Sequence, residues 1–202
     1  MKYFEYTDIE TDYLKSKDKK LAEVIDRAGH LLLPVDDDVF SSVVRNITAQ
    51  MVSGSAFQTV WTRITDSLGE VTPDSVLEAG AERLQSFGMS FRKAEYIADF
   101  ARKVHDGEFT PESIKTMNDD EAMRALTSIR GIGEWTAEMI LLFTLQRKNI
   151  FSFKDLGIIK GLCAVYHHKE ITKERFMRYR IRFSPYGSIA SFYLWEAAND
   201  SR

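Results

Sequence analysis

The sequence has very little cysteine and no long hydrophobic run. Its 202 residues include one cysteine, Cys163, which excludes a disulfide within the chain and a metal cluster held by cysteines of this chain alone. No apolar stretch approaches the ~20 residues that span a membrane, and the N-terminus is too charged for a secretory signal. We therefore expect a globular protein without membrane contact, in a compartment that keeps the thiol reduced.

Positive charge is not in excess, because 27 Lys and Arg residues face 30 Asp and Glu residues. The net charge is −3, which argues against a protein that binds nucleic acid through a broad basic surface. The acids gather in residues 1–38, with ten acids against six bases, which leaves a net charge of +1 for the rest. In that remainder, residues 173–182 hold five bases and one acid, and Arg175, Arg178 and Arg182 share one helical face. That face is either solvated or a stripe that binds phosphate, and the sequence leaves both open.

Strand-like alternation is scarce, and the four prolines fall between segments with helical periodicity. Thr72 and Pro73 suit the N-cap and the first position of a helix, and Gly107 suits the end of another. The pattern predicts an all-α fold. Helical segments are predicted at residues 18–31, 38–69 with a break near Ser53 and Gly54, 72–80, 90–107, 118–129, 134–143, 155–167, 173–182 and 185–199.

The stretch IRGIGEWTAEMILLF, residues 129–143, joins two of these helices through a short glycine-rich turn. Glycine lets the backbone turn sharply and lets another chain approach closely. The N–H groups at a helix start have no partner within the helix and can bind a phosphate without side-chain charge. Gly131, Gly133 and Thr136 are therefore candidate phosphate contacts, although a plain helical hairpin has the same pattern.

A second segment, FSFKDLGIIKGL, follows at residues 151–162. With it, residues 129–162 strongly resemble the helix-hairpin-helix DNA glycosylases that carry a trailing catalytic aspartate. Within that family, the chain resembles the alkylbase, or DNA-3-methyladenine glycosylase II, branch. The resemblance covers most of the chain. Further matching segments are LAEVIDRAG, VVRNITAQMVSGSAF, VTPDSVLEAG, FGMSFRKAEYIADFARKV and PYGSIASFYLW.

The resemblance implies a helix-hairpin-helix glycosylase fold, with two helical subdomains that flank a DNA-binding cleft. Residues of about 39–147 would form one subdomain, which ends in the hairpin, and residues 1–38 with 148–202 would form the other. Larger relatives carry an extra N-terminal β-rich domain. We do not expect that domain in this chain, because the sequence begins close to the helical core.

Asp155 matches the catalytic aspartate of the family. Loss of a base builds positive charge on the sugar, which a fixed carboxylate stabilises, and the carboxylate can also act as a general base toward water. Local sequence alone favours a different role, the N-cap of the following helix, and one residue can fill both. Lys154 departs from the family, whose members often have an acidic or neutral residue there.

Two tryptophans match aromatic positions of the family. Trp135 lies where related bifunctional glycosylases place a lysine that forms a Schiff base, so its presence implies that water is the nucleophile. Trp195 matches a second aromatic residue of the base pocket. For each ring the alternative is a packed core residue.

Met51 matches the wedge that family members insert into the base stack when a base is extruded. Gln50 would then lie near the strand opposite the lesion. For Met51 the alternative is core packing.

The family often binds one sodium or potassium ion through hairpin carbonyls, which by position belong to Thr127, Ile129 and Ile132. The four histidines show no metal-ligand spacing with Cys163. We therefore expect no zinc, no iron–sulfur cluster and no required cofactor.

The resemblance implies a monofunctional enzyme that removes alkylated, cationic purines such as 3-methyladenine in base excision repair. The partner would be double-stranded DNA with damaged bases. We expect a monomer, cytoplasmic and nucleoid-associated in a prokaryote or nuclear in a eukaryote. Two alternatives stay open: a glycosylase of the same fold that prefers deaminated purines, and a non-catalytic protein that binds distorted duplex. Asp155 argues against the second, since binding alone has no use for a buried anion near phosphates.

Overall fold

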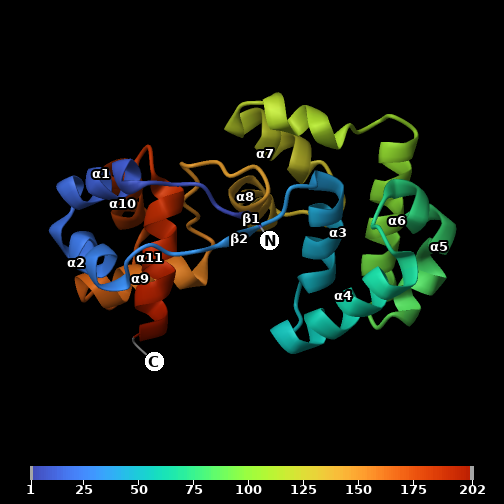
Figure 1. Cartoon of the computed structure of the whole chain (residues 1–202), viewed down its shortest axis with the longest axis horizontal. Coiled ribbons are helices and arrows are strands. Elements are labelled where there is room, and N and C mark those ends of the chain that lie inside the picture. The colour runs from blue at the N-terminus through green and yellow to red at the C-terminus, as the bar shows by residue number, and fades with distance from the viewer. Residues whose placement is uncertain (1, 201–202) are drawn as a thin grey trace. The chain divides into compact units, whose positions relative to one another are not determined.

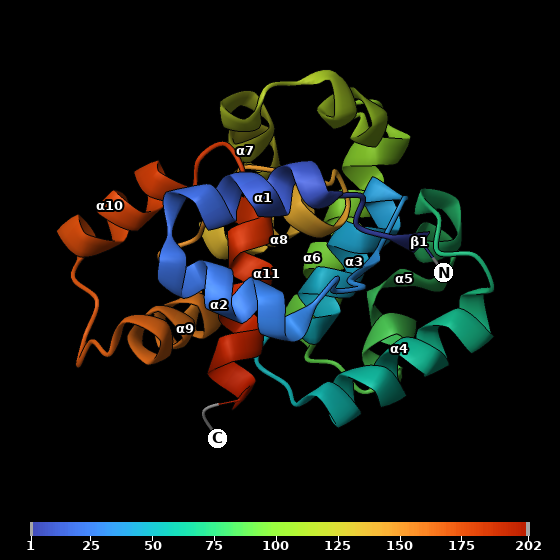
Figure 2. The same cartoon turned by 60° about the vertical axis from the view of Figure 1, so that its left-hand side comes forward.

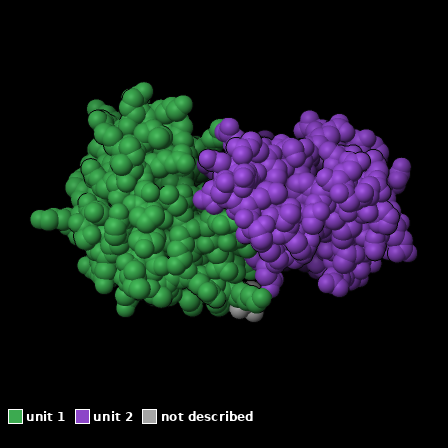
Figure 3. Space-filling view, turned by 90° about the horizontal axis from the view of Figure 1, so that it is seen from above, with its two compact units in different colours: residues 1–35, 141–202 green, residues 36–140 purple. Residues whose placement is uncertain are grey.

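The computed structural model describes residues 2–200 and confirms the all-α fold class (Figure 1). No helix in this range is long and apolar enough to cross a membrane. Contacts divide the chain into two compact units, coloured separately in Figure 3. Unit 1 comprises Met1–Val35 and Leu141–Arg202, and unit 2 comprises Asp36–Ile140. The division falls within one helix, α8 (Glu134–Phe143).

Unit 1 is a cluster of helices around the C-terminal helix. Its elements are β1 (Lys2–Tyr3), α1 (Asp8–Lys17), α2 (Lys19–Ala28), β2 (Pro34–Val35), α9 (Leu156–Tyr166), α10 (Lys173–Phe183) and α11 (Gly187–Asp200), with β1 and β2 paired antiparallel. α11 is the red helix of Figures 1 and 2 and contacts α9, α2, α1 and α10. Gly161 of α9 permits a close approach, because a Cβ there would lie 2.1 Å from the carbonyl oxygen of Leu194. A helix buried on nearly every side needs such neighbours all round.

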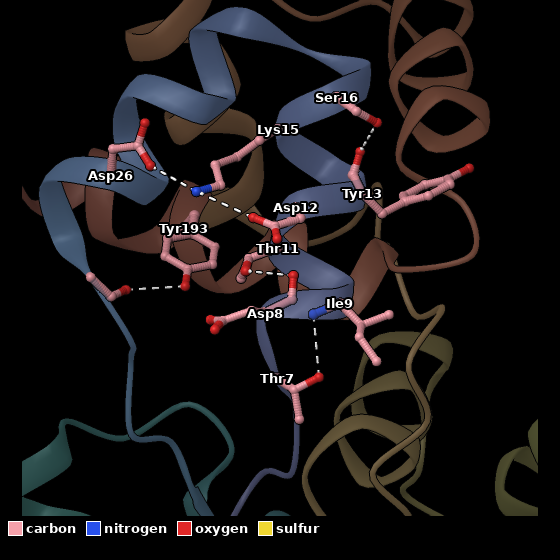
Figure 4. Close-up of polar contacts among 11 residues, drawn as sticks. Thr7, Asp8, Ile9, Thr11, Asp12, Tyr13, Lys15, Ser16, Asp26 and Tyr193 are labelled. Atoms are coloured by element: carbon pink, nitrogen blue, oxygen red, sulfur yellow. Dashed lines mark hydrogen bonds and ion pairs between the residues drawn. The ribbon is translucent and has the colours of Figure 1, made fainter.

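Polar contacts tie the first two helices to each other and to α11 (Figure 4). The ammonium of Lys15 on α1 lies 2.9 Å from Asp26 Oδ1 on α2. The hydroxyl of Tyr193 on α11 donates to the carbonyl of Gly29, directly after α2, at 3.1 Å. The N-terminal helices are therefore anchored to the helix that carries Trp195.

The basic helix α10 is partly committed to the fold of unit 1. Asp18 is buried and caps α2 through two backbone N–H groups. It also accepts a hydrogen bond of 2.5 Å from the guanidinium of Arg182. Arg182 therefore serves the packing of α10, a role that neither sequence-based alternative for its basic face included.

Unit 2 is a second helical cluster, in which α5 and α6 lie side by side (Figure 1). Its elements are α3 (Val39–Ala49), α4 (Gly54–Leu68), α5 (Pro73–Ser86), α6 (Phe91–His105), the 3-10 helix η1 (Pro111–Thr116), α7 (Asp119–Thr127) and the first turns of α8. α3 contacts α4, α6 and η1. Phe40 of α3 stacks on Phe100 of α6 with ring centroids 5.1 Å apart. α6 is therefore packed against both α3 and α5.

Most predicted helices are present, with caps that explain their ends. Thr72 caps α5 with Pro73 in its first turn, and Ser53 caps α4 at the predicted break. The sequence pattern does not predict α1, η1 or the part of α5 that continues beyond Gly80 to Ser86. Gly80 has φ 69°, so a kink interrupts the periodicity there.

Candidate active site

Asp155 lies at the start of α9 in unit 1 and is 7% exposed. Its Oδ1 accepts two hydrogen bonds of 2.9 Å, one from the backbone N–H of Ile158 and one from Nε1 of Trp195. The first of these makes Asp155 the N-cap of α9, so the capping role is confirmed. Two N–H donors at the positive end of a helix dipole compensate the charge of a carboxylate. The carboxylate is thus held in one orientation, with little contact with solvent.

Trp195 is packed so that its indole N–H reaches Asp155. Its ring stacks on Phe143 at the end of α8, with centroids 5.8 Å apart and ring planes 15° apart. Gly157 makes room for the ring, because a Cβ there would lie 2.6 Å from Trp195 Cδ1 and 3.0 Å from Asp155 Oδ1. The structure therefore brings together Asp155 and Trp195, two of the predicted site residues.

Three carboxylates are buried among residues 2–200, and all three belong to unit 1. Burial would raise the pKa of Glu10, but hydrogen bonds from the Lys148 ammonium and a nearby threonine outweigh it and lower the pKa to about 2. Asp18 faces Arg182. The ion pairs of Glu10 and Asp18 explain their burial as part of the fold. The carboxylate of Asp155 accepts hydrogen bonds from a backbone N–H and an indole N–H.

Met51 follows α3 in unit 2 and is 100% exposed. Its φ of 56° lies in the left-handed region, which costs a methionine about 1–2 kcal/mol. Val52, the next residue, is 44% exposed. The core alternative for Met51 is therefore wrong, and a large apolar side chain projects into solvent from a strained turn.

The turn that carries Met51 is held by two side chains. Gln50 Nε2 donates to the carbonyl of Gly131 at 2.8 Å. The ammonium of Lys93 on α6 donates to the carbonyl of Thr48 at 3.1 Å and to that of Gln50. The structure therefore connects Gln50 with the glycine-rich turn, and its place near the strand opposite a lesion stays a prediction.

The turn before α8 uses its two glycines differently. Gly131 has φ 93°, and a Cβ on it would lie 2.4 Å from the ring of Tyr96. Gly133 is exposed, and its carbonyl accepts the N–H of Ala137 in the first turn of α8. Thr136 is 6% exposed, so a phosphate contact at this position would fall to its backbone. Gly131 is thus needed for packing, and Gly133 is the exposed member of the predicted phosphate contacts.

The two predicted pocket tryptophans lie in different units. Trp135, the second residue of α8, belongs to unit 2 and is 42% exposed, so the core alternative is wrong for this ring. Trp195 belongs to unit 1 and is half-buried, with part of its ring used in the stack on Phe143. Both rings therefore keep some surface for a ligand.

The carbonyls predicted to hold a sodium or potassium ion belong to Thr127, Ile129 and Ile132. The carbonyl of Ile129 accepts the N–H of Ile132 at 3.0 Å, and a carbonyl oxygen has a second lone pair for a cation. Sodium and potassium ions bind carbonyl oxygens, so these three carbonyls are suitable ligands for such an ion. Within residues 2–200, no three His, Cys, Asp or Glu side chains are grouped as metal ligands.

Three residues at these sites were not found from the sequence: Lys93, Tyr96 and Gly157. Lys93 and Tyr96 are three positions apart on α6, so they share a helix face, which the sequence does indicate. Their partners are not indicated, because no pattern tells which carbonyl a lysine reaches or which glycine a ring packs on.

Known proteins resemble this chain in sequence and fold. Residues 44–184 match a family model described as HhH-GPD superfamily base excision DNA repair protein. YfjP of Bacillus subtilis (strain 168) is 28% identical over 189 residues, which are 88% of this chain and 65% of YfjP, so the chain spans slightly less than two thirds of that relative. The crystal structure of DNA-3-methyladenine glycosidase from Bacillus halodurans has a TM-score of 0.86 at 30% identity, over 98% of this chain and 93% of that chain. Schizosaccharomyces pombe 3-methyladenine DNA glycosylase (Mag1), in complex with abasic DNA, has a TM-score of 0.82 over 93% of this chain and 95% of that chain, and its 23% identity supports the fold alone.

Proposed function

The chain belongs to the HhH-GPD superfamily of base excision DNA repair proteins, and from this premise we propose that it is a DNA-3-methyladenine glycosylase. The substrate is double-stranded DNA that contains an alkylated purine. The reaction is hydrolysis of the bond between that base and its deoxyribose. Support comes from the family match over residues 44–184 and from the 30% identity with the Bacillus halodurans glycosidase.

The observation that carries the proposal is the buried and oriented carboxylate of Asp155. Cleavage of the N-glycosidic bond develops positive charge on the sugar. A carboxylate fixed by two N–H donors, away from bulk water, is preorganised to stabilise that charge. It can also accept a proton from the attacking water as a general base. In a protein that merely binds DNA, the same carboxylate would repel phosphates without a benefit.

Preference for an alkylated base follows from its charge. A 3- or 7-alkylated purine is cationic in the nucleoside and leaves as a neutral base, so its departure needs little protonation. The face of an electron-rich ring such as Trp135 attracts a cation by about 0.5–2 kcal/mol. That is roughly a two- to thirtyfold preference, since 1.36 kcal/mol corresponds to a factor of ten. The weakened glycosidic bond of the lesion supplies the rest of the selectivity.

Met51 supplies the wedge that replaces the extruded base. An apolar side chain inserted between base pairs fills the gap and kinks the duplex. The full exposure of Met51 supports this role, because an exposed side chain is accessible to DNA. Extrusion of the base gives the enzyme access to an atom that is hidden in the stack.

The product is an intact strand with an abasic site. Related enzymes that also cut the strand use a lysine to form a Schiff base, and tryptophan at position 135 has no amine for this step. As a further part of the proposal, the carbonyls of Thr127, Ile129 and Ile132 would hold a sodium or potassium ion that stiffens the hairpin.

The test is a base-release assay on duplexes that each contain one lesion. 3-Methyladenine and 7-methylguanine should be released rapidly, and hypoxanthine and 8-oxoguanine slowly. The DNA strand should stay uncut until alkali is added, and borohydride should trap no protein–DNA adduct. Binding without release of any base would overturn the proposed activity. A trapped adduct would overturn the water mechanism.

A further inference from the structure

We propose that Lys93 is a positioning residue for Met51, whose ammonium fixes the turn so that DNA meets a wedge already in place. The inference rests on the proposed function, which gives Met51 its role. Met51 is in an unusual state, because it is fully exposed and has φ 56°. A left-handed backbone is disfavoured for methionine, and such a turn persists only when neighbouring groups determine it.

Lys93 supplies that constraint at the C-terminal end of α3. Its ammonium donates to the carbonyls of Thr48 and Gln50, the residues that flank the last position of the helix before Met51. The last carbonyls of a helix have no partner within the helix, and a cation is favoured beside them because the helix dipole is negative there. Lys93 therefore caps the C-terminal end of α3 with a side chain from another helix, and fixes the backbone directly before the wedge.

The same face of α6 also supports the glycine-rich turn. Tyr96, one helical turn after Lys93, packs its ring where a Cβ of Gly131 would lie, 2.4 Å away. The guanidinium of Arg130 lies over the same ring, 4.9 Å from its centroid. Gln50 links the two turns through its bond to the Gly131 carbonyl. Within unit 2, α6 thus holds the wedge turn and the hairpin turn together.

The geometry separates this role from an ordinary phosphate contact. A lysine that binds phosphate turns its ammonium to solvent and contributes to the salt dependence of binding. The ammonium of Lys93 is partly buried and donates to two backbone carbonyls of its own chain. Loss of Lys93 should therefore weaken recognition of the lesion and leave the salt dependence unchanged.

The experiment is a double-mutant cycle with Lys93→Met and Met51→Ala, in the full-length protein. Affinity is measured for a duplex with a tetrahydrofuran abasic-site analogue and for the undamaged duplex, and the ratio is the lesion preference. A 2-aminopurine beside the abasic analogue reports unstacking by its fluorescence. Lys103→Met removes the same charge from the last turn of α6 and is the control. Lys93→Arg keeps a cation with several donors and should retain most of the preference.

Lys93→Met should lower the lesion preference about tenfold when Met51 is present. In the Met51→Ala background, the same substitution should lower it less than about twofold. The slope of affinity against salt should stay that of wild type, whereas loss of a phosphate contact lowers it by about 1. An equal loss in both backgrounds, or a lower slope, overturns the positioning role. Lys93→Gln replaces Lys93→Met if thermal unfolding shows that the methionine variant does not fold.

The two proposals fail in different ways. If Met51→Ala lowers the lesion preference and Lys93→Met does not, the inference about Lys93 is wrong and the wedge stands. If Met51→Ala leaves the preference unchanged, the wedge itself is wrong, and Lys93 loses its proposed role with it. Absence of base release by the wild-type protein overturns the glycosylase proposal independently of both.

Discussion

The two units depart from the usual distribution of side chains in opposite directions. Unit 1 buries a carboxylate, Asp155, at 7% exposure, whereas unit 2 exposes a large apolar side chain, Met51, at 100%. Folding alone favours neither, because burial of a charge costs free energy and an exposed methionine forgoes the stabilisation that its burial would give. In each unit, neighbouring groups hold the unusual side chain in one place: Ile158 and Trp195 hold Asp155, and Lys93 holds the turn of Met51.

The contrast indicates a division of roles. A fixed carboxylate away from bulk water suits a reaction that develops positive charge, since its electrostatic effect is strongest there. A fixed apolar side chain in solvent suits insertion into a base stack. We therefore propose that unit 1 carries out the chemistry and that unit 2 distorts the DNA. Four predictions test whether the two assignments can be separated.

Among the four substitutions, Asp155→Asn in unit 1 should have the largest effect on base release. Asparagine keeps the shape and remains a good N-cap for α9, but it removes the charge. The rate of base release at saturating enzyme should fall by about 10²–10³-fold or more. A single-turnover assay on a 7-methylguanine duplex measures this, and wild-type turnover by the variant would refute the role of Asp155.

Trp195→Phe tests whether the hydrogen bond from Trp195 to Asp155 contributes to the rate of base release. Phenylalanine can still stack on Phe143, but it cannot donate to Asp155 Oδ1. A hydrogen bond to a charged group contributes about 1.5–3 kcal/mol, so base release should slow by roughly ten- to a hundredfold. Trp135→Phe, in unit 2, is the comparison variant and should slow release less, because Trp195 is the ring whose Nε1 donates to Asp155 Oδ1. Equal losses in both variants would count against orientation of Asp155 by Trp195.

Met51→Gly tests the role of the exposed side chain in unit 2. Glycine adopts φ 56° without strain, and this gain is offset by greater freedom of the unfolded chain. The free energy of unfolding should therefore change by less than about 1 kcal/mol, while affinity for abasic DNA falls. Ile47→Ala, in the core of α3 at 0% exposure, is the control and should lose about 2–5 kcal/mol. A similar loss of stability in both variants would return Met51 to the core.

Glu10→Gln should have the smallest effect on activity and a clear effect on acid stability. The pKa of Glu10 is about 2 in the folded chain against an ordinary value of 4.5. A lowered pKa means that the carboxylate stabilises the fold above about pH 4.5, and that this stabilisation is lost as pH falls toward 2. Unfolding midpoints measured between pH 2 and 7 should depend less on pH in the variant. An unchanged pH profile would show that the ion pair with Lys148 contributes nothing.

Much of the fold was accessible from the sequence, because helical periodicity and caps are local. The break at Ser53 and the cap at Thr72 are read from a few adjacent residues, and the N-cap role of Asp155 is read from its place before an apolar run. α1 was missed because charged residues dominate it, so it has little apolar periodicity. The helix beyond Gly80 was missed because glycine usually ends a helix.

The candidate sites were less accessible, because their contacts join residues far apart in the chain. The bond between Asp155 and Trp195 spans forty positions, and Lys93 reaches carbonyls more than forty positions earlier. The left-handed φ of Met51 has no sequence signal, since glycine or asparagine is the usual residue there. Family resemblance named Asp155, Trp195 and Met51, and it gave no account of what holds them.

The most direct test of the division of roles compares Asp155→Asn and Met51→Ala on one 7-methylguanine duplex. Two quantities are measured for each variant. One is the single-turnover rate of base release at saturating enzyme, and the other is the dissociation constant for the same duplex with an abasic site in place of the lesion. Asp155→Asn should lose at least about a hundredfold in rate with affinity kept or improved. Met51→Ala should lose mainly affinity, with a far smaller loss of rate at saturation. The division of roles is wrong if Asp155→Asn weakens binding as much as it slows release, or if Met51→Ala slows release at saturation as much as Asp155→Asn does.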